Sequence, residues 1–277
     1  MNLIIQSATD ISLGHITLLA GLTTASGSEQ ISSHAWRLNE VKPHDAVASY
    51  CWDNHLDYAF VKPKRHLRDF GLVVMDMDST LISIECIDEI ADLASIKPQV
   101  AAITAAAMRG EIEFAESLRR RVALLQGLEE SALQHVYDHR LTLNPGAEKL
   151  LKKLKALEIK TLLVSGGFTF FTDNLKARLG LDYAYSNTLE IINGKLTGKI
   201  LGPILDAQGK ADCLIHTRDS LGLKAEQVLA VGDGANDLKM MAEVEISIAY
   251  HAKPVVRAQA SYALNFSGLD AIINLFA

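Results

Sequence analysis

Two aspartates at the end of an apolar segment are the first candidates for chemistry. Residues 72–76 read LVVMD, and Asp78 follows Asp76 after a single residue. Residues i and i+2 of an extended strand face the same way, so both carboxylates can point into one site. At about 4 Å and an effective dielectric near 20, two like charges repel by on the order of 4 kcal/mol. We therefore expect a cation beside them, although an exposed strand end followed by a helix cap also fits the pattern.

A second apolar segment ends in the same way. Residues 228–233 read VLAVGD, which places Asp233 between two glycines and ahead of Asn236 and Asp237 at a helix start. Taken alone, this pattern is also typical of a glycine turn with a helix cap. Because the carboxyl ends of neighbouring parallel strands meet at one edge of a sheet, we expect Asp76 and Asp233 to converge there. Their oxygens would suit Mg²⁺.

Residues that could bind an anion lie between these two segments. Ser165, Gly166 and Gly167 follow the apolar residues 160–164, and a hydroxyl with free backbone N–H groups at a helix start can hold an anion. An ordinary strand-to-helix turn would look the same. Lys210, in DAQGKADCL, begins a helix, and its spacing alone does not separate it from a surface lysine. Together the set indicates phosphoryl transfer through an aspartyl-phosphate, with Asp76 as nucleophile and Asp78 as general acid and base.

The elements that position these residues alternate between strand and helix. Short apolar runs predict parallel strands at 72–76, 160–165, 228–233 and 246–250, and amphipathic segments predict helices at 147–157, 169–179, 210–221 and 237–242. The alternation predicts a Rossmann-like, doubly wound α/β sheet. Residues 84–143 read as helical throughout and are expected to form a cap inserted after the first strand. Residues 189–200 predict a β-hairpin around Asn193-Gly194.

The first part of the chain has a different pattern. Residues 1–68 predict a small α+β domain, with strands at 2–7, 33–38 and 57–61, a helix at 15–25 and no clear fourth strand. The basic residues 62–68, KPKRHLR, read as a solvated linker rather than as an anion-binding patch. Residues 69–277 then form the larger domain, and the boundary falls at about 62–70.

Composition excludes several classes of protein. The 277 residues carry a net charge of −6, with 49% hydrophobic and 22% charged residues, which is typical of a folded chain and not of one that coats nucleic acid. The three cysteines, Cys51, Cys86 and Cys213, are too few and too far apart for a disulfide framework. No apolar run approaches the roughly 18 residues of a membrane span, and the start lacks the basic residues of a signal peptide. We expect a cytoplasmic protein; whether it forms a homodimer stays open.

These motifs resemble those of the haloacid dehalogenase superfamily. DMDST, SGGF, the lysine and GDGAND occur in this family's order, and residues 71–252 are similar to its phosphoserine phosphatase branch. The longer matches are VMDMDSTLISIECIDEIA, MRGEIEF, SLRRRV, SGGFTFF and GDGANDLKMM. The resemblance implies a Mg²⁺-dependent enzyme that hydrolyses O-phospho-L-serine to L-serine and phosphate through an aspartyl-phosphate, the last step of serine biosynthesis.

The resemblance also implies a role for each matching residue. Asp76 attacks phosphorus, and Asp78 protonates the departing oxygen and then activates water. Mg²⁺ is held by the carboxylates of Asp76 and Asp233 and by the main-chain carbonyl of Asp78. The remaining roles are phosphoryl binding by Ser165, Gly166 and Lys210, support by Gly167, Asn236 and Asp237, amine binding by Glu85, carboxylate binding by Arg121, and an apolar lid of Met108 and Phe114.

One cap residue has support from its spacing. Arg121 shares a helical stripe with Phe114, Leu118 and Leu125, so a charged side chain points where apolar ones point. A carboxylate bound by its guanidinium would explain this position. An arginine that lays its stem along apolar surface would explain it equally well.

Three other functions compete with this one. A different phosphatase or a phosphotransferase of the same superfamily would not need Glu85 and Arg121. A signalling receiver domain also uses clustered acids, a lysine and an aspartyl-phosphate, but it is shorter and has no helical cap. A catalytically inactive binding module would not need every motif intact. For residues 1–68 the pattern resembles a shortened ferredoxin-like domain, for which dimerisation or structural support is at least as suitable as amino-acid binding.

Overall fold

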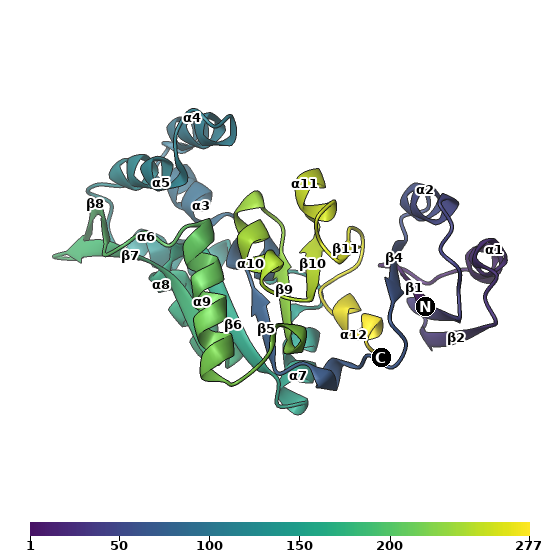
Figure 1. Ribbon diagram of the computed structural model, residues 1–277. Helices are drawn as coiled ribbons and strands as arrows, with labels where there is room; N and C mark the ends of the chain where they lie inside the picture. The colour runs from purple at the N-terminus through teal and green to yellow at the C-terminus, as the bar shows by residue number, and fades with distance from the viewer.

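A seven-stranded sheet with the order β11-β10-β9-β5-β6-β7-β8 forms the centre of the larger part of the chain. The computed structural model describes residues 1–277 (Figure 1). The pairs from β11 through β7 are parallel, and β7 and β8 are antiparallel. The strands are β5 (Leu72–Met75), β6 (Lys160–Phe168), β7 (Tyr183–Ile192), β8 (Lys195–Leu201), β9 (Val228–Gly232), β10 (Ile246–Tyr250) and β11 (Tyr262–Leu264).

Helices cover both faces of this sheet, as alternate residues of its strands require. In β5, Val73 and Met75 belong to one buried cluster and Leu72 and Val74 to another. The first face is covered by α7 (Ala147–Ala156), α8 (Thr169–Leu179) and α12 (Ala271–Leu275), and the second by α9 (Ala207–Ser220), α10 (Leu238–Ala242) and α11 (Pro254–Arg257). The predicted doubly wound α/β fold is confirmed.

The register of the three central strands decides what lies at the carboxyl edge. Met75, the last residue of β5, pairs with Val231 in β9 and with Leu163 in β6. The residues that follow each of these strands therefore emerge next to one another. In this way the sheet brings together segments that are far apart in the sequence.

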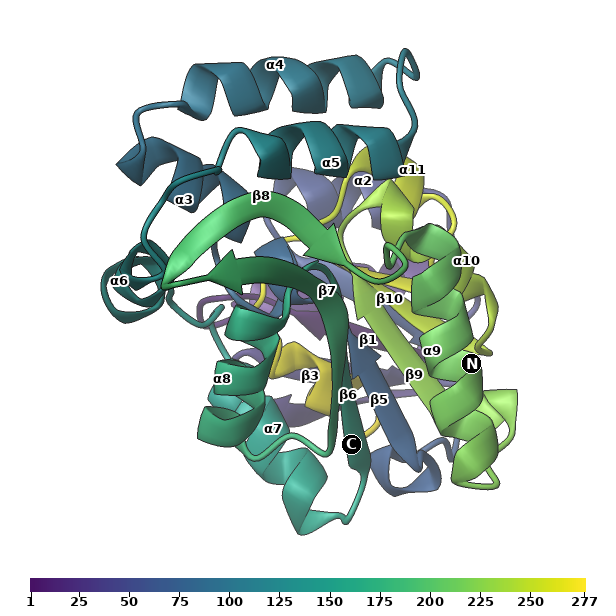
Figure 2. The same ribbon diagram turned by 90° about the vertical axis from the view of Figure 1, so that its left-hand side faces the viewer.

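A helical cap stands over this edge (Figures 1 and 2). It consists of α3 (Cys86–Leu93), α4 (Lys97–Met108), α5 (Phe114–Ala123) and α6 (Ser131–His139). The two linkers that connect it to the sheet pair at Ile82 and Leu143. The predicted turn at Asn193-Gly194 connects β7 and β8, and its two residues have positive φ angles of 53° and 76°. This hairpin forms backbone hydrogen bonds with the cap at residues 127–128.

The first part of the chain has the order βαββαβ, with the antiparallel sheet order β2-β3-β1-β4. Its elements are β1 (Asn2–Gln6), α1 (Leu13–Thr23), β2 (Gly27–Ser32), β3 (Ala35–Asn39), α2 (Ala46–Asp53) and β4 (Asp57–Val61). The expectation of no clear fourth strand was wrong, because β2 completes a ferredoxin-like arrangement. β2 reads GSEQIS and is an exposed edge strand, so it lacks the apolar alternation that reveals a strand.

This small sheet is packed firmly against the rest of the molecule. Ile4, Ala59 and Val61 join the main buried cluster together with Ile272 and Phe276 near the C-terminus. The basic segment 62–68, expected to be a solvated linker, also contacts the core. Lys62 Nζ lies 2.6 Å from Glu245 Oε1, Arg65 donates to the Glu226 carbonyl, and Leu67 is buried.

The Asp57 carboxylate joins the two parts most directly. It is 1% exposed and accepts hydrogen bonds from the backbone N–H groups of Asn265, Phe266 and Ser267, at 2.6, 3.2 and 2.8 Å. Charged acceptors make stronger hydrogen bonds than neutral ones, and a buried donor without a partner is costly. Asp57 therefore holds the loop after β11 against the end of β4.

We expect Asp57→Asn to lower the free energy of unfolding by roughly 3 kcal/mol, because an amide cannot accept all three hydrogen bonds and loses the charge that strengthens them. Urea denaturation measures the change, with the exposed Asp53→Asn as the matched control. A loss below about 0.5 kcal/mol, the size of an ordinary surface substitution, would show that Asp57 does not hold the loop.

Candidate active site

A buried lysine lies between two buried carboxylates at the carboxyl edge of the sheet. Lys210 Nζ is 2.7 Å from Asp76 Oδ1 and 2.8 Å from Asp237 Oδ1. Asp76 follows β5 and Lys210 lies in the first turn of α9, whose N-cap Asp206 accepts from two backbone N–H groups of that turn. The helix start is thus fixed by its own cap, and this sets the direction of Lys210.

The loop after β9 folds around Asp237. Asp237 Oδ2 accepts the backbone N–H groups of Asp233 and Gly234, each at 3.1 Å. A Cβ at residue 232 would lie 2.5 Å from this oxygen, so Gly232 is required for the close approach. Asp233 in turn accepts a hydrogen bond from the Thr80 hydroxyl at 3.0 Å. The carboxylate of Asp233 is therefore held from the loop that carries Asp76.

Asp78 and Ser165 form the other side of the site. Asp78 Oδ1 accepts the Cys86 N–H at 2.9 Å, and Asp78 Oδ2 accepts the Ser165 hydroxyl at 3.2 Å. Ser165 Oγ also accepts the Gly167 N–H at 2.9 Å. A Cβ at residue 167 would lie 2.9 Å from Asp78 Oδ2, so glycine is needed here as well. Cys86 is buried, as free cysteines commonly are.

The carboxylates of the site are poorly compensated. Burial raises the pKa of Asp76, and the neighbouring Asp237 raises it further, against the lowering effect of Lys210. Burial also raises the pKa of Asp78. Burial and Asp237 raise the pKa of Asp233 to about 6. Burial is the largest cause of each shift, and for Asp76 and Asp233 the neighbouring Asp237 carboxylate adds to it, so Lys210 offsets only part of the cost of holding these charges in the site.

The donor set fits a divalent cation. Carboxylate oxygens of Asp76, Asp233 and Asp237 lie within 4.8 Å of one another. Both oxygens of Asp237 already have partners, in Lys210 and in the backbone N–H groups. Asp76 and Asp233 each keep one oxygen, Oδ2, without a hydrogen bond from the protein. A site with a few free carboxylate oxygens suits a hard cation such as Mg²⁺, which keeps several water ligands.

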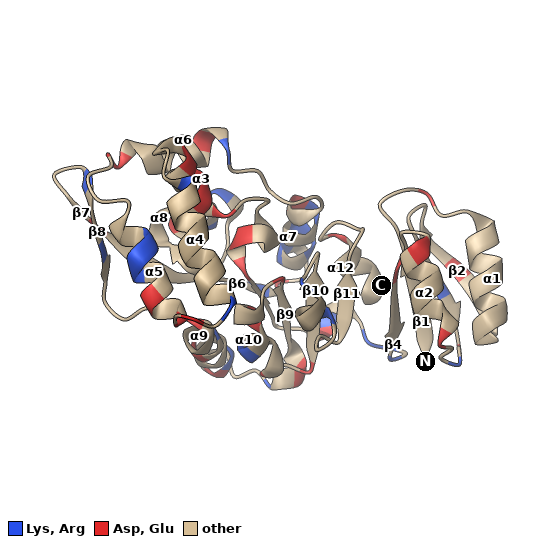
Figure 3. Ribbon diagram, turned by 90° about the horizontal axis from the view of Figure 1, so that it is seen from above, with Lys and Arg blue, Asp and Glu red and all other residues tan.

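Two cap residues face the site with opposite charge. Glu85, at the N-cap of α3, accepts the Ser79 hydroxyl at 2.8 Å, and burial together with Asp78 raises its pKa to about 7. Arg121 is partly buried and forms no salt bridge, and its one hydrogen bond runs from Nε to the Ser117 carbonyl at 3.4 Å. Burial lowers the pKa of Arg121, which Asp88 and Glu85 oppose. Figure 3 shows the acidic α3 and the basic α5 from above.

Of the other predicted residues, Phe114 and Asn236 lie at the site, whereas Met108 does not. Phe114 lies over Gly166, because its Cζ would be 3.2 Å from a Cβ at that residue. Asn236 is partly buried, and its side chain folds against Gly234. Met108, expected to form a lid, is 67% exposed at the end of α4 and does not cover the site in this structure.

Sequence reasoning gave no role to three polar residues that hold the loops of the site. Thr80 holds Asp233. Asn144 donates to the carbonyls of Ser79, Thr80 and Ile82, at 3.3, 2.8 and 3.0 Å. Asn187, 2% exposed, bridges the Gly166 carbonyl and the Leu205 N–H, at 2.9 and 2.7 Å. Only Thr80 lies within a motif; the asparagines come from segments where no sequence pattern marks them.

We expect Thr80→Val to weaken Mg²⁺ binding about tenfold, because the isosteric change removes the hydroxyl that orients Asp233, and loss of such a supporting hydrogen bond typically costs ten- to a hundredfold. Titration calorimetry with Mg²⁺ measures the affinity. Thr80→Ser keeps the hydroxyl and should retain nearly all of it. Unchanged binding in Thr80→Val would exclude this role for Thr80.

Comparison with known proteins agrees with the geometry. The profile of the haloacid dehalogenase-like hydrolases matches residues 70–245, and a profile described only as a domain of unknown function matches residues 3–47. A phosphoserine phosphatase from Polaromonas is 54% identical over 218 residues, 77% of this chain and 92% of the relative.

Solved structures show the same relationship. A probable phosphoserine phosphatase from Vibrio cholerae, in its unliganded form, superposes with a TM-score of 0.87 at 38% identity, over 99% of this chain and 86% of the other. A phospho-aspartyl intermediate analogue of phosphoserine phosphatase gives a TM-score of 0.70 at 38% identity, over 75% of this chain and 99% of that one. No helix of the chain is long and apolar enough to cross a membrane. The chain belongs to the phosphoserine phosphatases of the haloacid dehalogenase-like hydrolase family.

Proposed function

We propose that the chain hydrolyses O-phospho-L-serine to L-serine and phosphate. The observation that carries the proposal is that the cap places two groups of opposite charge, Glu85 and Arg121, above the Asp76 centre, and that neither of them has a salt bridge. A substrate with an amine and a carboxylate would supply the two charges that Glu85 and Arg121 lack, and its phosphate would then lie at the Asp76 centre, where a divalent cation would offset the negative charge. The similarity to phosphoserine phosphatases across 77% of the chain supports the same substrate.

In the first step, the Asp76 carboxylate attacks phosphorus and the bond from phosphorus to the serine oxygen breaks. Asp78 gives its proton to the departing oxygen, so L-serine leaves as the alcohol and Asp76 carries the phosphoryl group. The raised pKa of Asp78, caused by its burial, favours the protonated form that this step requires. The Cys86 N–H and the Ser165 hydroxyl hold the carboxyl group in place.

In the second step, Asp78 acts as a base. It takes a proton from water, the water oxygen bonds to phosphorus, and the acyl–phosphate bond to Asp76 breaks. Phosphate leaves, and both aspartates return to their starting states. A base two residues from the nucleophile explains why this phosphoaspartate would turn over rapidly rather than persist as a signal.

Charge balance during both steps comes from several groups. Lys210, Ser165 and the Gly166 N–H bind the phosphoryl oxygens. Mg²⁺, held by the carboxylates of Asp76 and Asp233 and by the Asp78 carbonyl, would supply positive charge against the transferring phosphoryl group. Asn236 and Asp237 support the phosphate and the waters of the metal. Asn187, which donates to the Gly166 carbonyl, holds the backbone of this turn in place.

The cap supplies selectivity for the substrate. Glu85 binds the amine and Arg121 the carboxylate, and each ion pair relieves an uncompensated, partly buried charge. Phe114 excludes water above Gly166, which strengthens these interactions. Met108 can join this lid only if the cap moves relative to the structure described.

The proposal also covers the division of the chain into domains and its location in the cell. Residues 69–277 form the phosphatase, with the cap inserted at about 84–143, and residues 1–68 form a ferredoxin-like support. The three free cysteines suit the reducing cytoplasm.

We expect Arg121→Ala to reduce kcat/KM for phosphoserine about a hundredfold, because the substrate carboxylate loses a charge-assisted partner. Turnover of p-nitrophenyl phosphate, which has no carboxylate, should change by less than about threefold. The neighbouring Arg120→Ala, which removes only an exposed pair with Glu116, is the matched control. Equal losses on both substrates would refute the role of Arg121.

We expect Asp76→Asn to lower phosphate release by roughly a thousandfold or more, since an amide cannot attack phosphorus. A chelator should abolish the activity of the wild type, and added Mg²⁺ should restore it. The assay uses phosphoserine and follows free phosphate, with thermal unfolding to verify that the variant is folded. Metal-independent turnover, or turnover that survives Asp76→Asn, would contradict the mechanism.

A further inference from the structure

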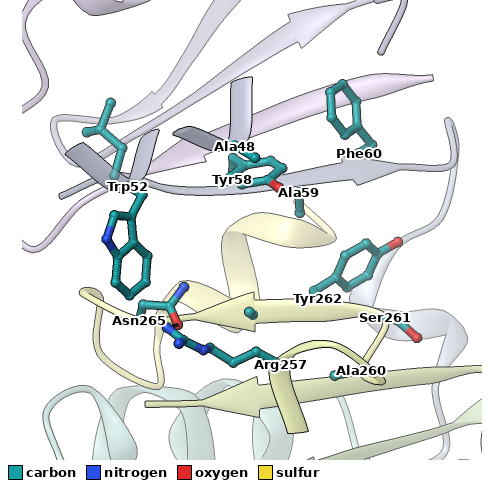
Figure 4. A pocket seen from close by; sticks show the side chains of 12 residues that line it. Ala48, Trp52, Tyr58, Ala59, Phe60, Arg257, Ala260, Ser261, Tyr262 and Asn265 are labelled. Atoms are coloured by element: carbon teal, nitrogen blue, oxygen red, sulfur yellow. Dashed lines mark hydrogen bonds between the residues drawn. The ribbon is translucent and has the colours of Figure 1, made fainter. Parts of the chain in front are cut away.

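A cavity of about 570 Å³ lies where the small antiparallel sheet meets the larger one, away from the acidic centre. It opens between β4 and β11, the edge strands of their respective sheets, which do not pair with each other (Figure 4). Cavities of this volume at domain boundaries are the usual places for small-molecule binding. Nothing in the proposed reaction uses it.

The walls of the cavity are mostly apolar and aromatic. Nine of its twelve lining residues are hydrophobic, and Figure 4 shows Trp52 and Tyr262 on opposite sides of the space, with the Phe60 ring pointing away from it. Trp52 of α2 is 50% exposed although it contacts the larger domain, with its ring 5.4 Å from that of Phe266. A flat apolar ligand would cover this exposed surface. The aromatic residues that line the cavity are Trp52, Tyr58, Phe60 and Tyr262.

The charged side chain in the cavity is that of Arg257, and it favours a negatively charged ligand. Arg257 of α11 lies with its Cζ 4.7 Å from the centre of the Trp52 ring, and it makes one hydrogen bond, from Nη1 to Asn265 Oδ1 at 3.3 Å. It forms no salt bridge, and no acidic residue lines the cavity. A guanidinium with four free N–H donors in such a place matches a carboxylate in shape and charge.

We propose that this cavity binds a small carboxylate with an aromatic or similarly flat apolar body, with the acid on Arg257 and the body among the aromatic rings. The site goes beyond the proposed phosphatase reaction and does not depend on it. Because its walls come from both parts of the chain, a bound ligand would also tie the N-terminal sheet to the core.

The test is a calorimetric titration with 3-phenylpropanoate and with 3-phenylpropanamide, which has the same body without the charge. The acid should bind at least tenfold more tightly than the amide. Arg257→Gln should remove this difference, and Ala48→Phe, which fills the cavity, should weaken both ligands. Arg178→Gln, at an exposed position on α8, should change neither. Thermal unfolding verifies that each variant is folded.

Two results would overturn the site. One is equal affinity for the acid and the amide. The other is loss of binding in Arg121→Ala while Arg257→Gln binds as the wild type, which would place the acid in the catalytic cap.

Discussion

The ammonium group of Lys210 makes the burial of this acidic centre possible. It lies within 2.8 Å of an oxygen of Asp76 and of Asp237, and its side chain is 1% exposed. Burial alone would lower the pKa of a lysine, but Asp237 and Asp76 together raise it, so the group stays charged. A buried ion pair that loses one partner costs about 3–5 kcal/mol. Asp78 and Asp233 form no salt bridge with this lysine, and the donor set of the site fits a divalent cation that would offset their charge.

The scaffold around this centre keeps like charges close without letting them relax apart. Three parallel strands in fixed register deliver the loops, and glycines at 167 and 232 let backbone and carboxylate approach within distances that a Cβ would forbid. Thr80, Asn144 and Asn187 then hold those loops by side-chain hydrogen bonds. The net charge of −6 for the whole chain is no obstacle to an anionic substrate, since the charges close to a site, rather than the total charge of the chain, decide what binds there.

Much of this arrangement could be predicted from the sequence, because buried parallel strands leave strong apolar runs and each motif follows such a run. The strands 72–75, 228–232 and 246–250 and the helix 169–179 lie where the pattern placed them. Convergence of Asp76, Asp78 and Asp233 follows from strand order, which the alternation with helices implies. Their roles, and those of Glu85 and Arg121, remain predictions.

The parts that could not be predicted share a physical cause. β2 is exposed on an edge, and β11, α11 and α12 are too short for a periodic signal. Asn187 acts through contacts between loops, and only the folded chain reveals these. The exposed position of Met108 depends on how the cap sits, and sequence similarity carries no information on that.

The central claim is that Asp76 becomes phosphorylated during turnover. Asp78→Asn removes the group that protonates the departing serine oxygen and then activates water. The phosphorylated form should therefore accumulate when this variant is mixed with Mg²⁺ and p-nitrophenyl phosphate, whose leaving group departs without a proton. Acid quenching, peptic digestion and mass spectrometry then locate the modification. The account predicts one phosphoryl group on Asp76 within the peptide that spans DMDST, and none when Asp76 is also replaced by Asn. A phosphoryl group on another residue, or phosphate release by the wild type without any phosphorylated Asp76 in either protein, would contradict it.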